Sequence, residues 1–515
     1  MTYADSALSL LPPLLALTAA VVTRKVLLSL GLGIALGVVL LGGGDPIVSG
    51  AVLAEKITDL VWDDGALNSW NFYIVGFLLL LGMLTSILSA SGATEAFANW
   101  ALTRINSARS GRLMTAILGI VIFIDDYFNS LAVGSISRPV ADRLQISRAK
   151  LAYLLDSTAA PMCVLMPISS WGAYIIAVIG GILAAHNLTD MTAIHAFVAL
   201  IPMNFYALFA IVLVLVVSIW PINLGSMKTA EIAARDPEVL RAAIARESLT
   251  GLEPMHNGRV QNLLLPIAIL ILATVSALLM TGVYALQMAG EPMTVLGALE
   301  NTDVGLSLVM GGLVALLSAL SMIQRQKAPQ GLVFAALGHG IKSMMPAIYI
   351  LAFAWTIGSV ISSLETGTYL ASFVGTTIDV KWLPLLLFGL SGVMAFATGT
   401  SWGTFGIMLP IAGDMAAATE ISMMLPMLAA VLAGAVFGDH CSPISDTTIL
   451  SSTGAGCDHI EHVRTQLPYA MLVAGISAIG YAVLGISGSV VAALAVCCLV
   501  FCLLVFGLIR NSRFG

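Results

Sequence analysis

Two aspartates seven residues apart flank a proline in the segment VFGDHCSPISDTTILSSTGAG at residues 436–456. On an unbroken helix, Asp439 and Asp446 would lie two turns, roughly 10.5 Å, apart, which is too far to share one small cation. Pro443 has no amide hydrogen and clashes with the preceding turn, so we expect the helix to open there. Opening frees backbone carbonyl groups and lets both carboxylates approach one site. Hard oxygen ligands of this kind suit Na⁺, H⁺ or another small cation.

Other polar clusters interrupt apolar segments in a similar way, in FIDDYFNS, LLDSTAAP and FATGTSWGT. An acidic residue at membrane depth costs about 2.5–3.5 kcal/mol on insertion scales and is therefore a functional candidate by default. Almost no Lys or Arg accompanies these acids, so we interpret the missing counter-charge as the transported ion. The ion- or substrate-binding candidates are Asp125, Asp126, Asn129, Asp156, Ser157, Thr158, Thr398, Thr400, Ser401, Thr404, Asp439, Ser442, Asp446, Thr447 and Thr448, with Na⁺ proposed at Asp156, Asp439 and Asp446.

The amino-acid composition indicates that the segments containing these polar clusters lie in a membrane. The chain of 515 residues is 59% hydrophobic and 10% charged, with a mean hydropathy of +0.99. Soluble domains carry about a quarter charged residues. The 48 glycines fit the high glycine content of membrane helices. We therefore predict an all-α polytopic membrane protein, and no nucleic-acid partner.

Apolar segments of about 17–25 residues can cross the hydrocarbon core. Short loops rich in Lys and Arg stay cytoplasmic, which predicts an outside N-terminus and a cytoplasmic C-terminus. We expect the protein in the bacterial cytoplasmic (inner) membrane. The acidic loop at 44–71 and the stretch at 284–303 would then lie outside. We expect about 11 spans plus 2 re-entrant hairpins, and the clear candidate spans are 7–22, 26–43, 72–90, 193–218, 263–283, 304–322, 346–364, 468–486 and 489–509.

Similar features recur in the same order in the two halves of the chain. Each half has a plain helix, then an interrupted hairpin, then a long segment broken near an Asp and a Pro. The basic residues give the two copies opposite senses, which is the inverted-repeat architecture of secondary transporters. The predicted organisation is an N-terminal half at 1–220 with a hairpin at 113–137 and a broken helix at 151–185, a cytoplasmic linker loop at 221–262, and a C-terminal half at 263–515 with a hairpin at 384–412 and a broken helix at 421–455.

Less specific explanations compete with these assignments. Ser and Thr in membrane helices more often bond a carbonyl of the preceding turn or pack helices than bind ions. Asp414 lies near a segment end, as expected of a cap or a solvated residue. In CDHIEH at 457–462 the spacing is too loose for zinc, and we favour pH sensing by His459 and His462, because histidine titrates in the physiological range. His440 beside Cys441 lacks an orienting group and an oxyanion hole, so we do not expect an enzyme.

Three strings carry a family resemblance: GDHCSPISDTTILSSTGAGCDHIEHVRTQLPYA at 438–470, FIDDYFNSLAVGSISRPVADR at 123–143 and SWGTFGIMLPIA at 401–412. They resemble the NhaC family of sodium/proton antiporters, across most of the chain and in matching order. The resemblance implies exchange of Na⁺ (or Li⁺) for H⁺ and paired hairpins within inverted repeats. Relatives also include exchangers that couple Na⁺ and H⁺ to small organic acids.

Two functions therefore stay open at this point: a cation/proton antiporter working by alternating access, or a Na⁺- or H⁺-coupled transporter of a dicarboxylate, hydroxy acid or amino acid. The expected partners are small cations, a small organic solute under the second alternative, and the lipid bilayer. A homodimer is an open alternative to a monomer. We expect no cofactor, with Na⁺ and H⁺ serving as transported or coupling ions.

Overall fold

The computed structural model describes residues 3, 6–23, 25–63, 65–123, 125–167, 169–188, 191–236, 255–290, 292–366, 369 and 379–512. Parts of the expected organisation lie outside these residues, among them 237–254 of the predicted linker, Ile124 of the first hairpin, Ile168 of the first broken helix, Asp64 of the 44–71 loop and Glu291 of the 284–303 stretch.

Helices make up nearly all of the described chain, and the only strands described form one short antiparallel hairpin that pairs Trp62 with Leu67. In chain order the elements are η1 (Ala7–Leu10), α1 (Leu11–Thr23), α2 (Val26–Leu41), α3 (Pro46–Thr58), β1 (Trp62–Asp63), β2 (Ala66–Leu67), α4 (Ser69–Ala90), α5 (Ala93–Leu102), α6 (Ala108–Val121), α7 (Asp126–Arg143), α8 (Arg148–Cys163), α9 (Ser170–Ala185), α10 (Ala193–Leu200), η2 (Ile201–Met203), α11 (Phe205–Ile219), α12 (Ser226–Ala233), α14 (Gln261–Ala289), α15 (Val295–Glu300), α16 (Val304–Arg325), α17 (Gln330–Ser363), η3 (Val380–Trp382), α19 (Leu383–Thr398), α20 (Ser401–Thr419), η4 (Ile421–Met423), α21 (Met424–Cys441), α22 (Asp446–Ala455), α23 (His459–Ser487) and α24 (Val490–Ser512).

Seven helical segments of the described chain are long and apolar enough to cross a membrane. The number becomes eight if α10–η2 and α11, which meet at a 54° bend, count as one span. The backbone of a membrane span must satisfy its own hydrogen bonds, and helices do so within one segment. The prediction of an all-α polytopic membrane protein is therefore confirmed. The seven segments are Ser69–Ala90, Gln261–Ala289, Val304–Arg325, Val380–Thr398, Ile421–Cys441, His459–Ser487 and Val490–Arg510.

The span count differs in detail from the sequence prediction. The first two predicted spans, 7–22 and 26–43, correspond to η1–α1 and α2, which are shorter than the seven segments above. The segment predicted at 346–364 is the second part of the longer helix α17. Conversely, Val380–Thr398 covers the first arm of the predicted second hairpin, and by length and apolarity it could span alone. The count of eleven spans and two hairpins, and the inverted sense of the halves, therefore stay predictions.

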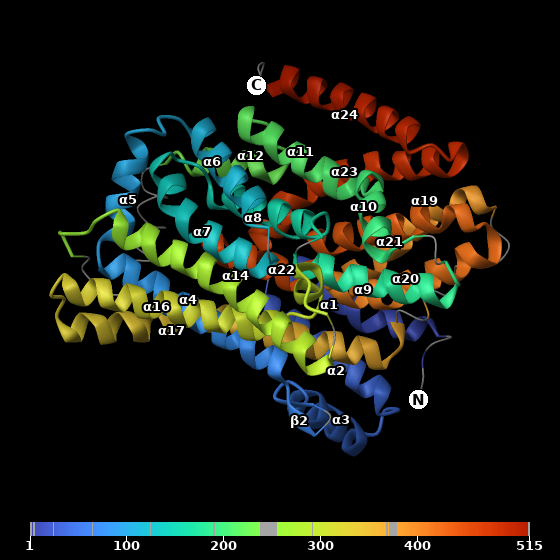
Figure 1. Cartoon of the computed structure of the whole chain (residues 1–515), viewed down its shortest axis with the longest axis horizontal. Helices are drawn as coiled ribbons and strands as arrows, with labels where there is room; N and C mark the ends of the chain where they lie inside the picture. Colours follow the sequence, from blue (N-terminus) through green and yellow to red (C-terminus); the bar gives the residue numbers. More distant parts are fainter. Residues whose placement is uncertain are drawn as a thin grey trace.

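Helices from both sequence halves pack together in each large apolar core. One core joins α8–α11 to α19–α21, α23 and α24. The other joins α4, α5 and α7 to α14, α16, α17 and α22. Figure 1 shows α7, α8, α21 and α22 in the centre, with α4, α14, α16 and α17 along one side and α23 and α24 along the other. The polar breaks described below lie where these two sets of helices meet.

Glycines allow the central helices to approach closely. A Cβ on Gly438 of α21 would lie 2.0 Å from the carbonyl oxygen of Gly392 in α19, and one on Gly434 would lie 2.2 Å from that of Phe388. In a membrane, where lipid is as apolar as the helix surface, this close backbone packing is a main source of helix association. It places the end of α21, with Asp439, against α19 and the start of α20.

Candidate functional site

Helix breaks bring backbone and carboxylate groups together at the centre of the protein. Helix α21 ends at Cys441 and α22 begins at Asp446, on either side of Pro443. Helix α19 ends at Thr398, is capped by Gly399 with a left-handed φ of +71°, and α20 begins at Ser401. The start of a helix such as α20 or α22 has unpaired N–H groups and the positive end of the helix dipole. Both favour a carboxylate at that position.

Asp439 binds the start of α20. Its Oδ2 accepts hydrogen bonds from the backbone N–H of Ser401 at 3.1 Å and from the Ser401 hydroxyl at 2.7 Å. The Asp439 side chain is buried, and its other oxygen, Oδ1, has no hydrogen-bond partner among the described residues. The carboxylate is therefore fixed through one oxygen and has the second available for a proton or a cation.

Asp446 lies at the start of α22 and receives a hydrogen bond from the Tyr127 hydroxyl of α7. Its other oxygen accepts the backbone N–H of Thr447 at 2.8 Å. Asp446 also interacts electrostatically with Asp439, Asp125 and Asp126. Asp439, Asp446 and the two aspartates at the start of α7 thus form one electrostatic group.

The start of α7 supplies the second acidic pair. Asp125 caps the helix by accepting the backbone N–H of Phe128 at 2.9 Å. Asp126 is buried, and its Oδ2 has no hydrogen-bond partner among the described residues. Asn129 holds the break closed, because its amide donates to the carbonyl oxygens of Gly119 and Ile122, at 2.6 Å each. Asn129 is therefore placed as a structural clamp for the acidic pair.

Three members of this group have no ion pair with a basic residue: no Lys or Arg in the described part of the chain forms one with Asp126, Asp439 or Asp446. Buried charges normally need a partner, because removing them from water is costly. A bound cation or protons would supply it. The described residues contain no set of three His, Cys, Asp or Glu side chains close enough to hold one metal ion, so hydroxyl and carbonyl oxygens would have to complete the shell of a cation.

A cavity of about 1150 Å³ leads to this group. Its inner part is lined by Tyr127 and Asp446, by the tip of the α19–α20 break at residues 398–400, and by Tyr174 and Trp402. Its outer part is lined by Lys56, Asp59, Asn68, Trp70 and Asn71 of the 44–71 stretch, and by Asn301, Thr302, Asp303 and Val304. Both outer segments belong to the side that the basic residues predict to lie outside.

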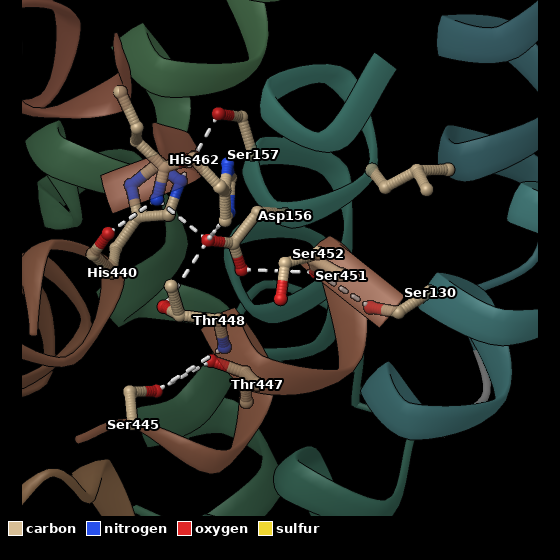
Figure 2. A network of polar contacts seen from close by, with 12 residues as sticks. Ser130, Asp156, Ser157, His440, Ser445, Thr447, Thr448, Ser451, Ser452 and His462 are labelled. Carbon is tan, nitrogen blue, oxygen red and sulfur yellow. Dashed lines mark hydrogen bonds and ion pairs between the residues drawn. The ribbon is translucent and has the colours of Figure 1, made fainter. Parts of the chain in front are cut away.

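Asp156 of α8 lies in a separate network, which Figure 2 shows between α8 and α22. Its Oδ2 accepts Thr448 at 3.2 Å and Gln466 at 2.5 Å, and lies 3.1 Å from Nε2 of His462. Its Oδ1 accepts Ser451 at 3.2 Å. A carboxylate has about four acceptor positions, so protein donors already occupy Asp156. The three aspartates predicted to share one Na⁺ therefore fall into two groups, Asp439 with Asp446 and Asp156 alone.

His440 connects this network to α8 and α11. Its Nε2 hydrogen bonds with Ser157 at 3.0 Å and its Nδ1 with the Tyr206 hydroxyl at 2.7 Å. Both ring nitrogens are thus used in holding three helices together. His459 is used similarly at the next break, where its Nε2 lies 2.8 Å from the carbonyl oxygen of Pro443. The two histidines expected to sense pH, His459 and His462, are both in the interior and contact this region directly.

The hydroxyl groups of the remaining predicted residues form hydrogen bonds within their own helices or between the helix breaks. Thr158 and Thr398 donate to carbonyl oxygens of their own preceding turns, at 2.8 and 2.9 Å. Thr404 donates to the carbonyl of Thr400 at 3.1 Å. Ser442 donates to the carbonyl oxygen of Phe396 at 2.8 Å, which ties the two breaks together, and the Thr447 hydroxyl hydrogen bonds with Ser445 at 2.9 Å. These hydroxyls support the helix breaks, and Thr398 and Thr400 also line the cavity.

Sequence reasoning missed Tyr127, Ser451 and Gln466, although each contacts a predicted aspartate. Gln466 could have been found from spacing, since positions 459, 462 and 466 lie on one face of a helix. Ser451 lies five residues after Asp446 in the hydroxyl-rich run of α22. For Tyr127 no spacing signal exists, because its partner lies 319 residues away.

Several known proteins are similar to this chain in sequence. A model of the Na⁺/H⁺ antiporter family matches residues 162–486. An uncharacterized protein of Haemophilus influenzae is 51% identical over 493 residues, which cover 95% of this chain and 93% of that protein. Two more distant relatives match over about a third of their own lengths. The malate-2H⁺/Na⁺-lactate antiporter of Bacillus subtilis is 33% identical over 29% of this chain and 32% of its own, and an uncharacterized Na⁺/H⁺ antiporter of H. influenzae is 34% identical over 30% and 33%.

The matched family and these named relatives are transporters, which agrees with the expectation that the chain is not an enzyme. The matched region, 162–486, includes Asp439, Asp446 and the start of α20. Together with the apolar helices, the match identifies a multi-pass membrane antiporter. The chain belongs to the Na⁺/H⁺ antiporter family.

Proposed function

We propose that this protein, as a member of the NhaC branch of its family, exchanges Na⁺ or Li⁺ for H⁺ across the cytoplasmic membrane by alternating access. The observation that carries the proposal is the acidic group at the inner end of the cavity. Asp439 and Asp126 each have a buried oxygen without a partner among the described residues, and no described Lys or Arg pairs with them or with Asp446.

Competition for these carboxylates gives a simple exchange mechanism. A carboxylate oxygen that holds a proton cannot at the same time hold Na⁺, so the two ions exclude each other. In each change between the outward-open and inward-open states, the site then carries either Na⁺ or a proton. We propose Asp439 and Asp446 as the principal Na⁺ ligands, with Asp126 nearby, and Asp156 as a residue that positions α22.

Reciprocal helix contacts support two related halves. Helix α7 packs against α22, and α20 packs against α9. In each pair, the second helix of one expected hairpin contacts the distal helix of the other half's broken segment. We propose that the halves form inverted repeats around the acidic group, with the N-terminus outside and the C-terminus cytoplasmic, and that His459 and His462 transmit pH to the breaks.

Transport by purified protein in liposomes tests the function. With an imposed Na⁺ gradient, an internal pH dye should report proton movement opposite to Na⁺ in wild-type vesicles. Asp446→Asn vesicles should show none. Equal proton movement in protein-free vesicles, or a dye signal that does not respond to Na⁺ or Li⁺, would contradict the proposal.

A second function rests on the size of the cavity. A volume of about 1150 Å³ exceeds what a small cation needs and suits an organic solute. One relative is named for exchanging malate and lactate with H⁺ and Na⁺. The alternative is therefore Na⁺- or H⁺-coupled exchange of a small organic solute in the same cavity.

A further inference from the structure

The cavity has an acidic inner lining. Asp446 is the charged residue at the inner end, and Asp59 and Asp303 lie towards the outer end. Lys56 is the one basic residue among the described lining residues, and it already lies 3.6 Å from Asp59 and 3.8 Å from Glu55. A solute that reaches the inner end therefore meets negative charge.

Helix starts often bind anions through their free N–H groups, but at each helix start around this site a side chain of the protein already accepts at least one of these N–H groups. The start of α7 donates to Asp125, through Phe128 N–H at 2.9 Å. The start of α20 donates to Asp439, through Ser401 N–H at 3.1 Å. An organic carboxylate in the inner cavity would thus compete with a carboxylate of the protein at each of these two starts.

The start of α22 is used in the same manner. Thr447 N–H donates to its neighbour Asp446 at 2.8 Å, and Thr448 N–H donates to Ser445 at 3.4 Å. All three helix starts around the site thus carry an internal acceptor. A negatively charged lining of this kind is unfavourable for an anionic solute.

Aromatic side chains line the same cavity as Asp446. Tyr174 and Trp402 both line the cavity and pack on each other with ring centroids 4.9 Å apart. Trp171 packs edge-to-face against Trp402, with ring centroids 5.7 Å apart. Aromatic faces next to a carboxylate form the usual recognition site for organic ammonium ions, because the ring quadrupole attracts a cation and the ring packs against carbon.

We propose that the cavity binds a small organic ammonium ion, with its charged nitrogen at Asp446 and its carbon skeleton against Trp402 and Tyr174. The inference rests on the proposed antiport function, since it names a second class of cation for the same carboxylates. Such an ion would be exchanged in place of Na⁺, and malate- or lactate-like anions would be excluded.

Competition calorimetry on the purified full-length protein tests this, with ethanolamine and choline as cationic probes and L-malate and L-lactate as anionic probes. Ethanolamine and choline should bind, and each should weaken the apparent affinity for Na⁺ in proportion to its concentration. Binding of malate or lactate without binding of either ammonium probe would overturn the inference. So would ammonium binding that leaves the Na⁺ affinity unchanged.

The aromatic wall is tested by Trp402→Leu, with Tyr174→Leu as a second variant and Trp100→Leu as the matched control. Trp100 is partly exposed, lies under Arg104 and is not a cavity residue. In both cavity variants the choline affinity should fall by about fivefold or more relative to the Na⁺ affinity of the same protein. In the control the ratio should stay at the wild-type value. An unchanged ratio in both cavity variants would overturn the inference.

The two proposals fail in different ways. Wild-type protein that exchanges Na⁺ for H⁺ but binds neither ammonium probe would refute this inference and leave the proposed function intact. Wild-type protein that binds choline through Asp446, shown by its loss in Asp446→Asn, but exchanges no Na⁺, would support the inference and refute Na⁺/H⁺ exchange.

Discussion

Ser401 donates two hydrogen bonds to one oxygen of Asp439, from its backbone N–H at 3.1 Å and from its hydroxyl at 2.7 Å. The two residues are 38 positions apart and belong to different helix breaks. Because the other oxygen of Asp439 has no partner among the described residues, the contact orients the carboxylate without saturating it. That arrangement is what an ion ligand requires, since the protein sets its direction and the ion completes its coordination.

Removing the Ser401 hydroxyl should weaken Na⁺ binding while the backbone N–H still holds Asp439. A hydrogen bond to a charged group contributes about 1.5–3 kcal/mol, so Ser401→Ala should lower the Na⁺ affinity by about tenfold or more, as measured by calorimetry. Thr419→Ala is the control, because Thr419 is on the same helix and its exposed hydroxyl donates at 2.7 Å to its own helix carbonyl, of Met415. Wild-type Na⁺ affinity in Ser401→Ala would contradict the role of this contact.

Neutralising either aspartate of the central break should abolish exchange and leave the protein folded. Asp439→Asn and Asp446→Asn each remove a charge that the ion would balance, and they keep the side-chain shape. The measurement is Na⁺-driven proton movement in liposomes, beside the elution volume in detergent. Asp414→Asn is the matched control, because Asp414 is exposed and pairs only with His186 at 3.1 Å among the described contacts. Full exchange in both site variants would refute the assignment.

Asp156→Asn should instead destabilise the protein. Asp156 accepts Thr448, Ser451 and Gln466 and contacts His462 while fully buried. An amide nitrogen there would face donors, and breaking a buried charge network costs about 3–5 kcal/mol. The thermal unfolding midpoint in detergent should therefore fall further for Asp156→Asn than for Asp439→Asn. If Asp156→Asn keeps its midpoint and loses Na⁺ binding, Asp156 is an ion ligand and not a positioning residue.

Gly438→Ala should separate α21 from α19. The added Cβ would lie 2.0 Å from the carbonyl oxygen of Gly392, and backbone on both sides leaves no flexible group to yield. We expect a lower unfolding midpoint and loss of Na⁺ binding, since Asp439 is the next residue. Gly389→Ala on α19 is the control, with open space around its Cβ. Wild-type behaviour of Gly438→Ala would show that this close packing is not needed.

Na⁺ binding should depend on pH if the two ions share carboxylates. When binding displaces one proton, each unit fall in pH weakens the apparent Na⁺ affinity by up to about tenfold, or about 1.4 kcal/mol. The dependence should vanish at pH values where the site is already deprotonated. Calorimetric titrations with Na⁺ across a pH series measure it. A Na⁺ affinity independent of pH over the active range would exclude direct competition and favour Na⁺ as a bound co-ligand of an organic solute.

The sequence by itself determined that this protein folds in a membrane. It also determined which polar residues lie in the apolar segments. A chain with 10% charged residues and long apolar segments can only fold in a membrane. The break at Pro443 follows from the missing amide hydrogen of proline, and the helix does end at Cys441. Both features are local to the sequence, but a proline alone does not decide a helix break, since Pro161 lies inside α8.

Only the tertiary structure decided which acids act together. Asp156 and Asp439 have similar local sequences, yet Asp156 is surrounded by donors from α22 and α23, and Asp439 keeps one oxygen without a partner among the described residues. Tyr127 reaches Asp446 across 319 positions. The difference arises from which helices pack against each carboxylate. Long-range packing of this kind depends on the close approach of helices at glycines such as Gly438, and no local pattern records which partner each glycine will meet.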